Sequence, residues 1–311
     1  MTKKTIRLLA LVFAMLFMLC ACNGGEGADT TPAATTPAET TPADTTPAET
    51  TPAETTPEDT TAAPVVVDKT LRIMSFNIQC GINGTRDKDV MEFLINCGAD
   101  SIGTQETGDA WVSRFRKDKT FREMYDWIGD GRDGNKRGER CSILYRKDKF
   151  DLVESGTKWL SDTPDVSGSR LNGSEYIRIA TYVILKDKVS GQEFMHINTH
   201  LDTSSSTIRA AQAKLAVELS PKRDDIPVFF TGDFNCSFES EGYNTITGTL
   251  GFVNSATKAV AGDKYTNQTS DYGAIDFIFI KNYNFTVDKY TVYTEKKISD
   301  HRPVFIDITL P

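Results

Sequence analysis

Five short segments of the chain each place an acid, an amide or a histidine at the end of a hydrophobic stretch. They are Ser75-Phe76-Asn77-Ile78, Gly103-Thr104-Gln105-Glu106, Asn198-Thr199-His200-Leu201, Gly232-Asp233-Phe234-Asn235 and Ser299-Asp300-His301. Because hydrophobic strands bury themselves in a sheet, polar groups just beyond their ends gather at one rim of that sheet. Carboxylates, carboxamides and imidazoles gathered in this way suit a hard divalent cation and a phosphate group. The segments therefore predict a metal-dependent phosphoester hydrolase.

The segment Gly232-Asp233-Phe234-Asn235 is the most specific of the five. At average amino-acid usage a given tetrapeptide occurs at roughly one in 10⁵ positions. This one directly follows residues 227–231, which have the composition of a buried strand. A purely structural alternative is an Asx-type turn in which Asp233 and Asn235 bond only to the local backbone. The four companion segments favour a functional role for both side chains.

Glu106 and the pair Asp300-His301 complete the set. Glu106 follows a strand that carries no other acid at its end, and taken alone it is equally consistent with an exposed loop glutamate. Asp300-His301 precedes the final strand, where a hydrogen-bonded turn is the structural alternative. Their occurrence together with the Asp233 segment favours one shared site.

Two further acids, Asp276 and Glu139, are expected to support the two histidines of these segments. Asp276 lies inside an apolar run, where an unpaired charge would be costly, so it needs a partner, and the imidazole of His301 is a natural one. Glu139 is the candidate to orient His200. His196 lies four strand residues before His200, about 13 Å away at ~3.3 Å per residue, so we assign it to packing.

The elements that must position these residues belong to one α/β domain over residues 68–311. Apolar spacing predicts helices at 87–96 and 208–219, and short turns at 187–191 and 281–284 predict antiparallel hairpins. Strands are predicted at 71–78, 101–105, 141–146, 150–160, 177–185, 194–201, 227–231, 275–280, 285–293 and 303–309. We therefore expect a four-layer α/β sandwich, with two mainly antiparallel sheets packed face to face and flanked by helices.

Residues 1–22 have the pattern of a bacterial lipoprotein-type signal peptide. Three basic residues precede an apolar run, 8–22, that is too short to span a bilayer as a helix. The run ends in Leu19-Cys20-Ala21-Cys22, which resembles a lipobox. This resemblance implies cleavage before Cys22 and acylation there, so we expect the protein at the bacterial cell surface, lipid-anchored to the membrane at Cys22. The alternative is an ordinary secretory signal, which still predicts export.

Residues 23–67 are predicted to form a disordered stalk that carries most of the net charge. A Thr-Thr-Pro-Ala-Glu/Asp pattern repeats over 30–64 without a large apolar residue, and its prolines exclude a helix. Of the chain's 35 basic and 43 acidic residues, three and eight lie before Asp68, so the domain keeps 32 and 35 and a net charge of −3. That charge argues against recognition of long nucleic acid by electrostatics alone, although a metal site can still bind phosphate. We expect a monomer.

Together these segments resemble the endonuclease/exonuclease/phosphatase superfamily. That group includes pancreatic-type deoxyribonucleases, abasic-site endonucleases, neutral sphingomyelinases, inositol polyphosphate 5-phosphatases and poly(A) deadenylases. The resemblance spans residues 71–309, and all five segments occur in the family's order. The run 139–146, which begins with Glu139, is similar to the family's strand that carries the acid supporting the first histidine. Arg178 matches an arginine after which the family's central strand continues.

The resemblance implies a division of work between a metal and a water molecule. Glu106, helped by Asn77, would hold Mg²⁺ or Mn²⁺, which polarises a phosphoryl oxygen. Asp300 would lie next to the cation and help to hold it or a second one. Asp233 would orient and deprotonate the attacking water. Asn235 would donate hydrogen bonds to the phosphoryl oxygens as their charge grows, and Asn77 would also contact the phosphate.

The resemblance further implies that two supported histidines contact the substrate phosphate. His301, oriented by Asp276, and His200, oriented by Glu139, are the two. Arg178 is the remaining candidate for the phosphate. All of these roles come from the family, whereas the residue set follows from the sequence itself.

The substrate is expected to be a phosphoester, with nuclease-type hydrolysis of a phosphodiester in nucleic acid or a nucleotide as the first hypothesis. A phospholipid headgroup hydrolase of sphingomyelinase type would want an exposed aromatic hairpin, whereas Trp111, Trp127 and Trp159 are scattered. A phosphomonoesterase would want a basic pocket, which residues 132–138 could supply, although a solvated loop is the favoured interpretation of that segment. The rival from another class is a non-catalytic surface binding module, but every expected metal and water ligand is present.

Overall fold

The computed structural model describes residues 70–81, 85–263 and 269–310, all within one unit, Ala62–Pro311. The predicted signal segment 1–22, Cys22 and the stalk 23–67 lie outside the described residues. None of the helices in the described part of the chain is both long enough and apolar enough to cross a membrane.

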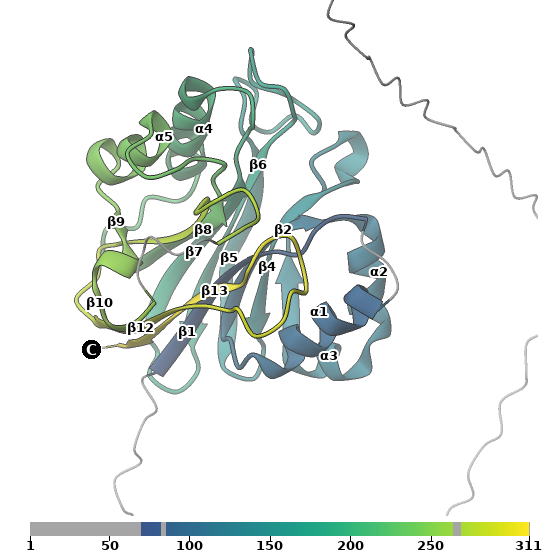
Figure 1. The fold of residues 1–311 in the computed structure, drawn as a ribbon, viewed down its shortest axis with the longest axis vertical. Helices are drawn as coiled ribbons and strands as arrows, with labels where there is room; N and C mark the ends of the chain where they lie inside the picture. Colours follow the sequence, from purple (N-terminus) through teal and green to yellow (C-terminus); the bar gives the residue numbers. More distant parts are fainter. Residues whose placement is uncertain (1–69, 82–84, 264–268, 311) are drawn as a thin grey trace, which may run out of the picture. The chain divides into compact units, whose positions relative to one another are not determined.

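Two mixed β-sheets form the centre of the domain (Figure 1). In sheet order, the first contains β10 (Ala259–Gly262), β12 (Thr286–Val292), β13 (Val304–Thr309), β1 (Thr70–Asn77), β2 (Ser101–Thr107), β4 (Arg140–Arg146) and β3 (Tyr125–Ile128). The second contains β5 (Phe150–Trp159), β6 (Ile179–Asp187), β7 (Glu193–His200), β8 (Val228–Asp233), β11 (Asp276–Lys281) and β9 (Val253–Asn254). Most neighbouring strands are antiparallel, as expected.

The first sheet has two parallel pairs of strands, β1 with β2 and β10 with β12, and the second sheet has one, β7 with β8. In the pairs β1–β2 and β7–β8, the carboxyl ends of the two strands therefore lie side by side. The register places Asn77 beside Gln105 and His200 beside Asp233. Strand β11 runs antiparallel to β8, so its first residue, Asp276, lies opposite Asp233. The topology thus delivers polar residues to one rim, which is where ligands bind in sheets of this kind.

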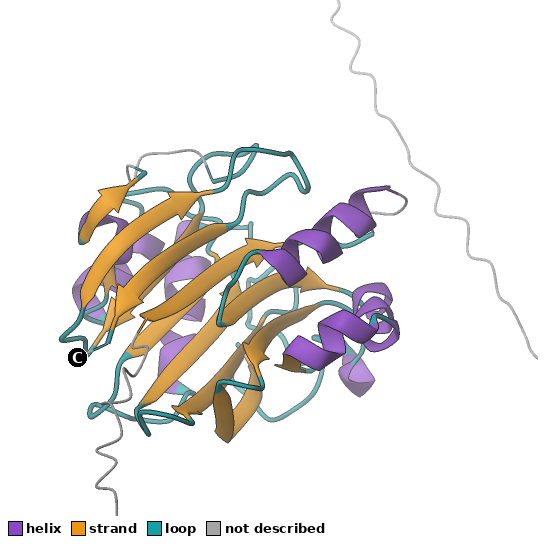
Figure 2. Ribbon diagram, turned by 90° about the horizontal axis from the view of Figure 1, so that it is seen from below, coloured by secondary structure: helices purple, strands orange, loops and turns teal. Residues whose placement is uncertain are grey.

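Helices cover the outer face of each sheet (Figures 1 and 2). They are α1 (Thr85–Asn96), α2 (Asp109–Lys117), α3 (Lys119–Met124), α4 (Ser206–Glu218) and α5 (Glu241–Asn244), with short turns η1 (Gly134–Lys136), η2 (Thr245–Thr249) and η3 (Ser255–Thr257). The side chains of Asp118 and Ser205 cap α3 and α4 by accepting hydrogen bonds from backbone amides. Helices α1 to α3 pack on the first sheet and α4 on the second. The predicted four-layer sandwich is confirmed.

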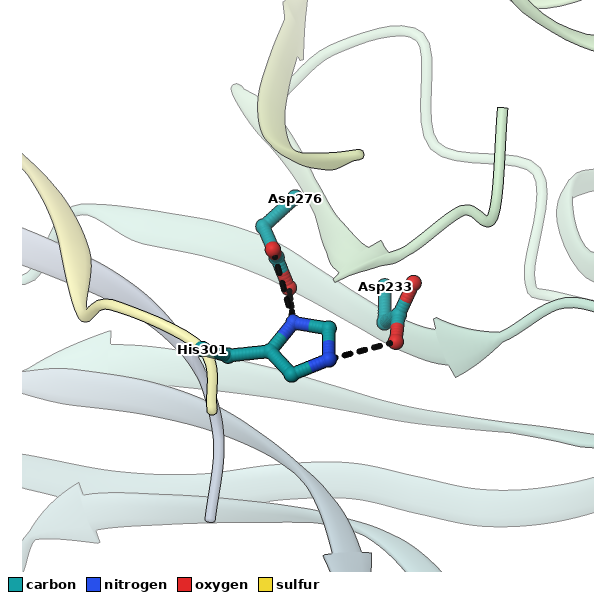
Figure 3. A group of neighbouring side chains, drawn as sticks. All are labelled: Asp233, Asp276 and His301. Carbon is teal, nitrogen blue, oxygen red and sulfur yellow. Dashed lines mark hydrogen bonds and ion pairs between the residues drawn. The ribbon is translucent and has the colours of Figure 1, made fainter. Parts of the chain in front are cut away.

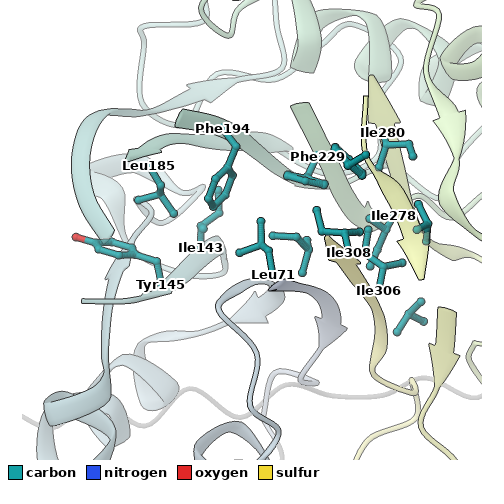
Figure 4. Packing of buried hydrophobic residues seen from close by; sticks show 14 of the residues in the cluster. Leu71, Ile143, Tyr145, Leu185, Phe194, Phe229, Ile278, Ile280, Ile306 and Ile308 are labelled. Atoms are coloured by element: carbon teal, nitrogen blue, oxygen red, sulfur yellow. The ribbon is translucent and has the colours of Figure 1, made fainter. Parts of the chain in front are cut away.

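A hydrophobic core fills the space between the two sheets over most of their area (Figure 4). Leu71, Ile143 and Ile306 come from the first sheet, and Phe194 and Phe229 come from the second. Fully burying a side chain of this kind contributes about 1.5–3 kcal/mol. This core holds the sheets face to face and thereby fixes the rim.

A polar layer replaces the apolar core between the sheets near the functional rim. His196 bridges the sheets, because its Nδ1 lies 2.7 Å from Ser101 Oγ and its Nε2 lies 2.8 Å from Thr231 Oγ1. Gly103 is required here, since a Cβ at this position would lie 2.1 Å from Thr231 Oγ1. Burial lowers the pKa of His196 to about 3, so its ring is neutral. The assignment of His196 to packing agrees with this position.

Two sequence expectations about the elements are wrong. Residues 281–284 do not close a hairpin, because β11 and β12 belong to different sheets and the chain crosses between them there, with Phe285 packed in the intersheet core. Helices were also expected in only two places, whereas α2 and α3 follow β2. Trp111 and Phe115, one helical turn apart, bury the inner side of α2.

Candidate active site

A pocket of about 380 Å³ lies at the rim formed by the ends of β2, β7 and β8 and the start of β13. Its lining residues are Glu106, Arg132, Glu139, Tyr176, Arg178, His200, Thr203, Asp233, Asn235, Tyr272, Ile275, Asp300 and His301. Eight of the ten predicted site residues line it, and the other two, Asn77 and Asp276, hydrogen-bond to lining residues. A larger cavity of about 640 Å³ lies between α1 and α3, but none of the predicted site residues lines it.

Asp233, the last residue of β8, is the centre of the pocket. One carboxylate oxygen, Oδ1, accepts a hydrogen bond from the backbone amide of Asn235 at 3.0 Å. The other, Oδ2, accepts one from Asn77 Nδ2 at 3.1 Å and faces His200 Nε2 at 3.4 Å and His301 Nε2 at 3.6 Å. The pKa of Asp233 rises to about 6, because burial and the nearby Asp276 carboxylate disfavour its ionised form. A carboxylate with a raised pKa and several fixed donors suits proton transfer.

His301 lies between two carboxylates (Figure 3). Its Nδ1 lies 2.9 Å from Asp276 Oδ2, and its Nε2 faces Asp233, as the sequence predicted for the Asp276 pair. Burial opposes a charge on the ring, but the Asp276 and Asp233 carboxylates outweigh it and raise the pKa of His301 to about 10. His301 is therefore a cation at neutral pH, fixed in orientation by Asp276.

His200 has no such support, and the expectation that Glu139 orients it is not met. Glu139 instead forms an ion pair with Arg132 Nη1 at 2.8 Å, and within the described ranges no hydrogen bond joins it to His200. A guanidinium is a permanent cation and competes better for a carboxylate than a neutral ring does. Burial and the positive charge of Arg178 hold the pKa of His200 well below its usual range. His200 is therefore neutral.

Glu106, Asn77 and Asp300 form an oxygen-rich side of the pocket. Asn77 Nδ2 donates a hydrogen bond to Glu106 Oε1 at 2.9 Å. The Ser299 hydroxyl lies 2.8 Å from the backbone carbonyl oxygen of Asn77 and 3.1 Å from Asp300 Oδ1, and it links these two residues. Glu106 has a positive φ of 58°, a strained backbone often found at functional sites. The carboxylates of Glu106 and Asp300 are hard oxygen donors of the kind that Mg²⁺ or Mn²⁺ prefers, so they fit the predicted ion. Asn77 supports this site by positioning Glu106, since its Nδ2 donates to Glu106 and its Oδ1 accepts from the Gln79 backbone amide at 3.0 Å.

A second group, Asp233, Asp276 and His301, brings its ligand atoms within 4.8 Å of one another. In this group His301 Nδ1 is already engaged by Asp276, and its Nε2 faces Asp233. A cation would have to compete with a protonated ring for both carboxylates. We therefore interpret these three residues as a hydrogen-bonded relay.

Asn235 follows β8 and also has a left-handed backbone, with φ of 47°. One N–H of its side chain donates to the Leu201 carbonyl at 2.9 Å, which fixes the carboxamide. A carboxamide has two N–H donors, and Asn235 lines the pocket. The second donor is thus available to a ligand.

Arg178 supplies a buried positive charge to the same pocket as Asp233 and His301. Its side chain is 5% exposed, and its Nε has no hydrogen-bond partner among the described residues. Burial lowers the pKa of Arg178, although Asp233 and Asp202 work against this shift. A buried guanidinium with an unused donor favours an anionic ligand.

Five lining residues were not identified as site residues from the sequence: Arg132, Tyr176, Thr203, Tyr272 and Ile275. Arg132 was assigned to a candidate basic loop, and Tyr176 and Tyr272 were not singled out. The guanidinium carbons of Arg132 and Arg178 lie 5.7 and 5.1 Å from the centre of the Tyr176 ring. The spacing of Tyr176 two residues before Arg178 was the one available signal, because the two side chains of such a pair lie on the same side of an extended chain.

Known proteins share both this sequence pattern and this fold. The model of the Endonuclease/Exonuclease/phosphatase family matches residues 74–301. A solved endonuclease/exonuclease/phosphatase from Bacteroides vulgatus is 30% identical, with a TM-score of 0.70 over 78% of this chain and 99% of that one. A mannosyl-6-phosphatase from Bacteroides thetaiotaomicron is 28% identical, with a TM-score of 0.68 over 76% of this chain and 99% of that one.

More distant relatives share less of the chain or less of its sequence. TDP2 from D. rerio, solved with a single-stranded DNA product, is 19% identical, with a TM-score of 0.63 over 78% of this chain and 99% of that one. Protein angel from Drosophila melanogaster is 30% identical over 122 residues, which are 38% of this chain and 34% of that protein. The match thus spans about a third of that curated relative. From the family match and the fold together, the chain belongs to the Endonuclease/Exonuclease/phosphatase family.

Proposed function

We propose that the protein is an exported, divalent-metal-dependent hydrolase of phosphate monoesters. One observation carries the proposal: Glu106, Asp233 and His301, which are far apart in the sequence, line a single pocket together with the buried cation Arg178. Phosphoester hydrolysis needs a carboxylate that holds a metal, a base that deprotonates water and cations that bind the phosphate. Glu106, Asp233 and the pair His301 and Arg178 match these three needs in turn.

Each residue has a role that matches its surroundings in the pocket. Asp233, with its raised pKa, accepts the proton of the attacking water. His301 donates from Nε2 to the phosphoryl group or the leaving oxygen, held in place by Asp276. Asn235 donates its free N–H to a phosphoryl oxygen. Mg²⁺ or Mn²⁺, held by Glu106, Asn77 and Asp300, supplies Lewis-acid stabilisation of the developing charge.

The cations of the pocket favour a monoester over a diester. A phosphomonoester carries a charge of about −1.5 to −2 at neutral pH, because its second pKa is near 6, whereas a diester carries one charge. Arg178 and His301 place two positive charges in the lining of the pocket that contains Asp233. A phosphomonoesterase was the alternative that required such a pocket, and the 28% identical relative is a mannosyl-6-phosphatase.

Hydrolysis of a nuclease-type phosphodiester is the second candidate. D. rerio TDP2 was solved with single-stranded DNA, but at 19% identity that likeness concerns the fold. The domain's net charge of −3 also gives no general attraction for a polyanion. For a lipid headgroup hydrolase, Trp111 and Trp159 are buried and Trp127 is partly buried. A binding module without activity is disfavoured by the complete set of metal and water ligands.

The location of the enzyme is part of the same proposal. The pattern of residues 1–22 supports export, and Cys22 would carry the lipid that anchors the protein to the membrane at the cell surface. The stalk 23–67 would then separate the catalytic domain from the anchor. We expect the protein to act as a monomer.

The test is phosphate release by the full-length protein from matched esters. We expect p-nitrophenyl phosphate to be hydrolysed faster than bis(p-nitrophenyl) phosphate, and both activities to vanish in EDTA and return with Mg²⁺ or Mn²⁺. Faster hydrolysis of the diester would overturn the monoester assignment. No metal-dependent release from either ester, by protein with a cooperative melting transition, would overturn the enzymatic proposal.

A further inference from the structure

Two exposed aromatic side chains lie at the mouth of the pocket. Tyr176 is 41% exposed and Tyr272 is 74% exposed, and they are the only exposed aromatic residues in the described parts of the chain. Both line the pocket. Aromatic rings bury large apolar areas when they can, so the occurrence of both exposed rings at one pocket calls for a reason other than folding.

The two tyrosines contact different candidate phosphate-binding residues. Tyr176 packs against Arg178 and Arg132, with the two guanidinium carbons 5.1 and 5.7 Å from the ring centre. Tyr272 approaches His301, with ring centres 6.2 Å apart. A phosphate that bridges Arg178 and His301 would therefore have an aromatic ring on each side of it.

The backbone under each ring is anchored. The amide of Tyr176 donates to the buried Asp202 carboxylate at 2.8 Å, and the amide of Tyr272 donates to the buried Ser270 hydroxyl at 3.0 Å. These bonds hold the tyrosines in position while leaving their rings in solvent. A ring held in place loses little conformational entropy when it binds a ligand.

We propose that Tyr176 and Tyr272 are specificity-determining residues that hold a cyclic leaving group, a sugar or a nucleoside, on either side of the phosphate. This inference rests on the proposed hydrolysis and names its substrate class. Aromatic rings stack on bases and on the apolar faces of sugars. A pocket of about 380 Å³ suits a small molecule of this kind, because a polymer needs an extended surface.

The test compares esters that differ in the leaving group. The full-length protein is assayed with a hexose 6-phosphate, adenosine 5′-monophosphate and glycerol 3-phosphate, the last of which has no ring. The measured quantity is the ratio of kcat/KM for each cyclic ester to that for glycerol 3-phosphate. The test variants are Tyr176→Ala and Tyr272→Ala. Tyr176→Phe and Tyr272→Phe are controls that keep the rings. Val260→Ala is a further control, which changes an exposed apolar side chain of β10.

We expect each alanine variant to lower the ratio by roughly tenfold, since stacking on one aromatic ring contributes on this scale. The phenylalanine variants and Val260→Ala should leave the ratio within about twofold. The cyclic ester with the larger ratio in the unmodified protein identifies the sugar or the nucleoside as the preferred group. A ratio unchanged in both alanine variants, or faster hydrolysis of a 5′-phosphorylated oligonucleotide than of adenosine monophosphate, overturns the inference.

A binding measurement separates this inference from the proposed hydrolysis. Calorimetry in EDTA measures binding of the same hexose phosphate and nucleotide to the unmodified protein and to both alanine variants. Tyrosine-dependent binding without turnover would support the ring contact and reject the hydrolytic function. Turnover of cyclic esters with equal affinity and equal ratios in all variants would retain the function and reject the ring contact.

Discussion

His200 and His301 face the same oxygen of Asp233 at nearly the same distance, 3.4 and 3.6 Å, yet their protonation differs. On the His301 side, Asp276 bonds the far nitrogen of the ring and keeps it charged. On the His200 side, burial and then the positive charges of Arg178, His301 and Arg132 lower the pKa of the ring and keep it neutral. The surroundings of each histidine ring other than Asp233 therefore determine its protonation more than the shared Asp233 carboxylate does.

This asymmetry gives the pocket two different ways to hold a phosphate. The His301 side offers an imidazolium whose proton can be transferred, whereas the His200 side offers the permanent charge of Arg178 and a neutral ring. Glu139 contributes to the difference, because it neutralises Arg132 instead of supporting His200. In the proposed mechanism, His301 transfers a proton and Arg178 recognises the charge of the phosphate.

Removing the shared carboxylate should have the largest effect. We expect Asp233→Asn to lower kcat by about 10³- to 10⁴-fold, since an amide cannot accept the water's proton. The melting temperature should not fall, because the change removes a buried charge with a raised pKa. Steady-state kinetics and thermal melts check both points. Activity within tenfold of the unmodified protein would remove Asp233 from the mechanism.

The matched pair Asp276→Asn and Glu139→Gln tests the comparison directly. Asp276→Asn should lower kcat by about 10²-fold or more, because His301 loses the partner that orients and charges it. Glu139→Gln should lower kcat by less than about tenfold, since Glu139 touches Arg132 and not His200. Equal losses in the two variants would show that Glu139 supports His200 during turnover after all.

The dependence of activity on pH should reflect both groups. Activity requires ionised Asp233 and protonated His301, so kcat/KM should rise through the pKa of Asp233, about 6, and fall through the pKa of His301, about 10. A bound cation moves the acidic limb to lower pH. In Asp276→Asn the alkaline limb should move down towards the ordinary histidine pKa of about 6.5. An alkaline limb that does not move would break the link between Asp276 and the charge of His301.

The smallest effect is expected at Asp202, which anchors the His200 side. It accepts hydrogen bonds from Ser174 Oγ at 2.6 Å and from the amides of Tyr176 and Ser204 at 2.8 and 2.9 Å. Burial opposes the ionised form, but these bonds outweigh it and hold the pKa of Asp202 well below its usual range. Asp202→Asn should therefore cost about 1–3 kcal/mol of unfolding free energy at pH 7.

The sign of the pH effect follows from that lowered pKa. The stabilisation is complete above the unfolded-state pKa of about 3.9 and is lost as the pH falls towards the folded-state value. Denaturant melts of the two proteins should therefore converge at acid pH. Asp225→Asn, at an exposed carboxylate paired with Arg223, is the control and should leave stability unchanged. A difference that persists unchanged at pH 3 would assign the effect to packing.

The sequence predicted the rim because strand ends are visible in it. Apolar runs followed by Asn77, Glu106, His200 and Asp233 marked the carboxyl ends of β1, β2, β7 and β8, which pair in parallel as β1 with β2 and β7 with β8. A buried acid needs a partner wherever it lies, so the Asp276–His301 pair was predictable too. Local composition and the cost of burying charge were sufficient for these residues.

Choices between competing partners were not predictable. Whether Glu139 reaches His200 or Arg132 depends on how the chain between β3 and β4 returns to the sheet, which no local pattern encodes. The crossing between β11 and β12 looks like a hairpin turn in sequence, because a turn residue does not specify which sheet follows. The exposure of Tyr176 and Tyr272 likewise depends on what the rest of the chain leaves uncovered.

The most direct test of a single metal-dependent pocket is a Mg²⁺ titration of phosphate release by the unmodified protein and by Glu106→Gln. The titration should saturate in both proteins, with the half-saturating concentration raised at least tenfold in the variant, since it loses a charged oxygen ligand. Superimposable titration curves, or hydrolysis that persists without any divalent ion, would contradict the account.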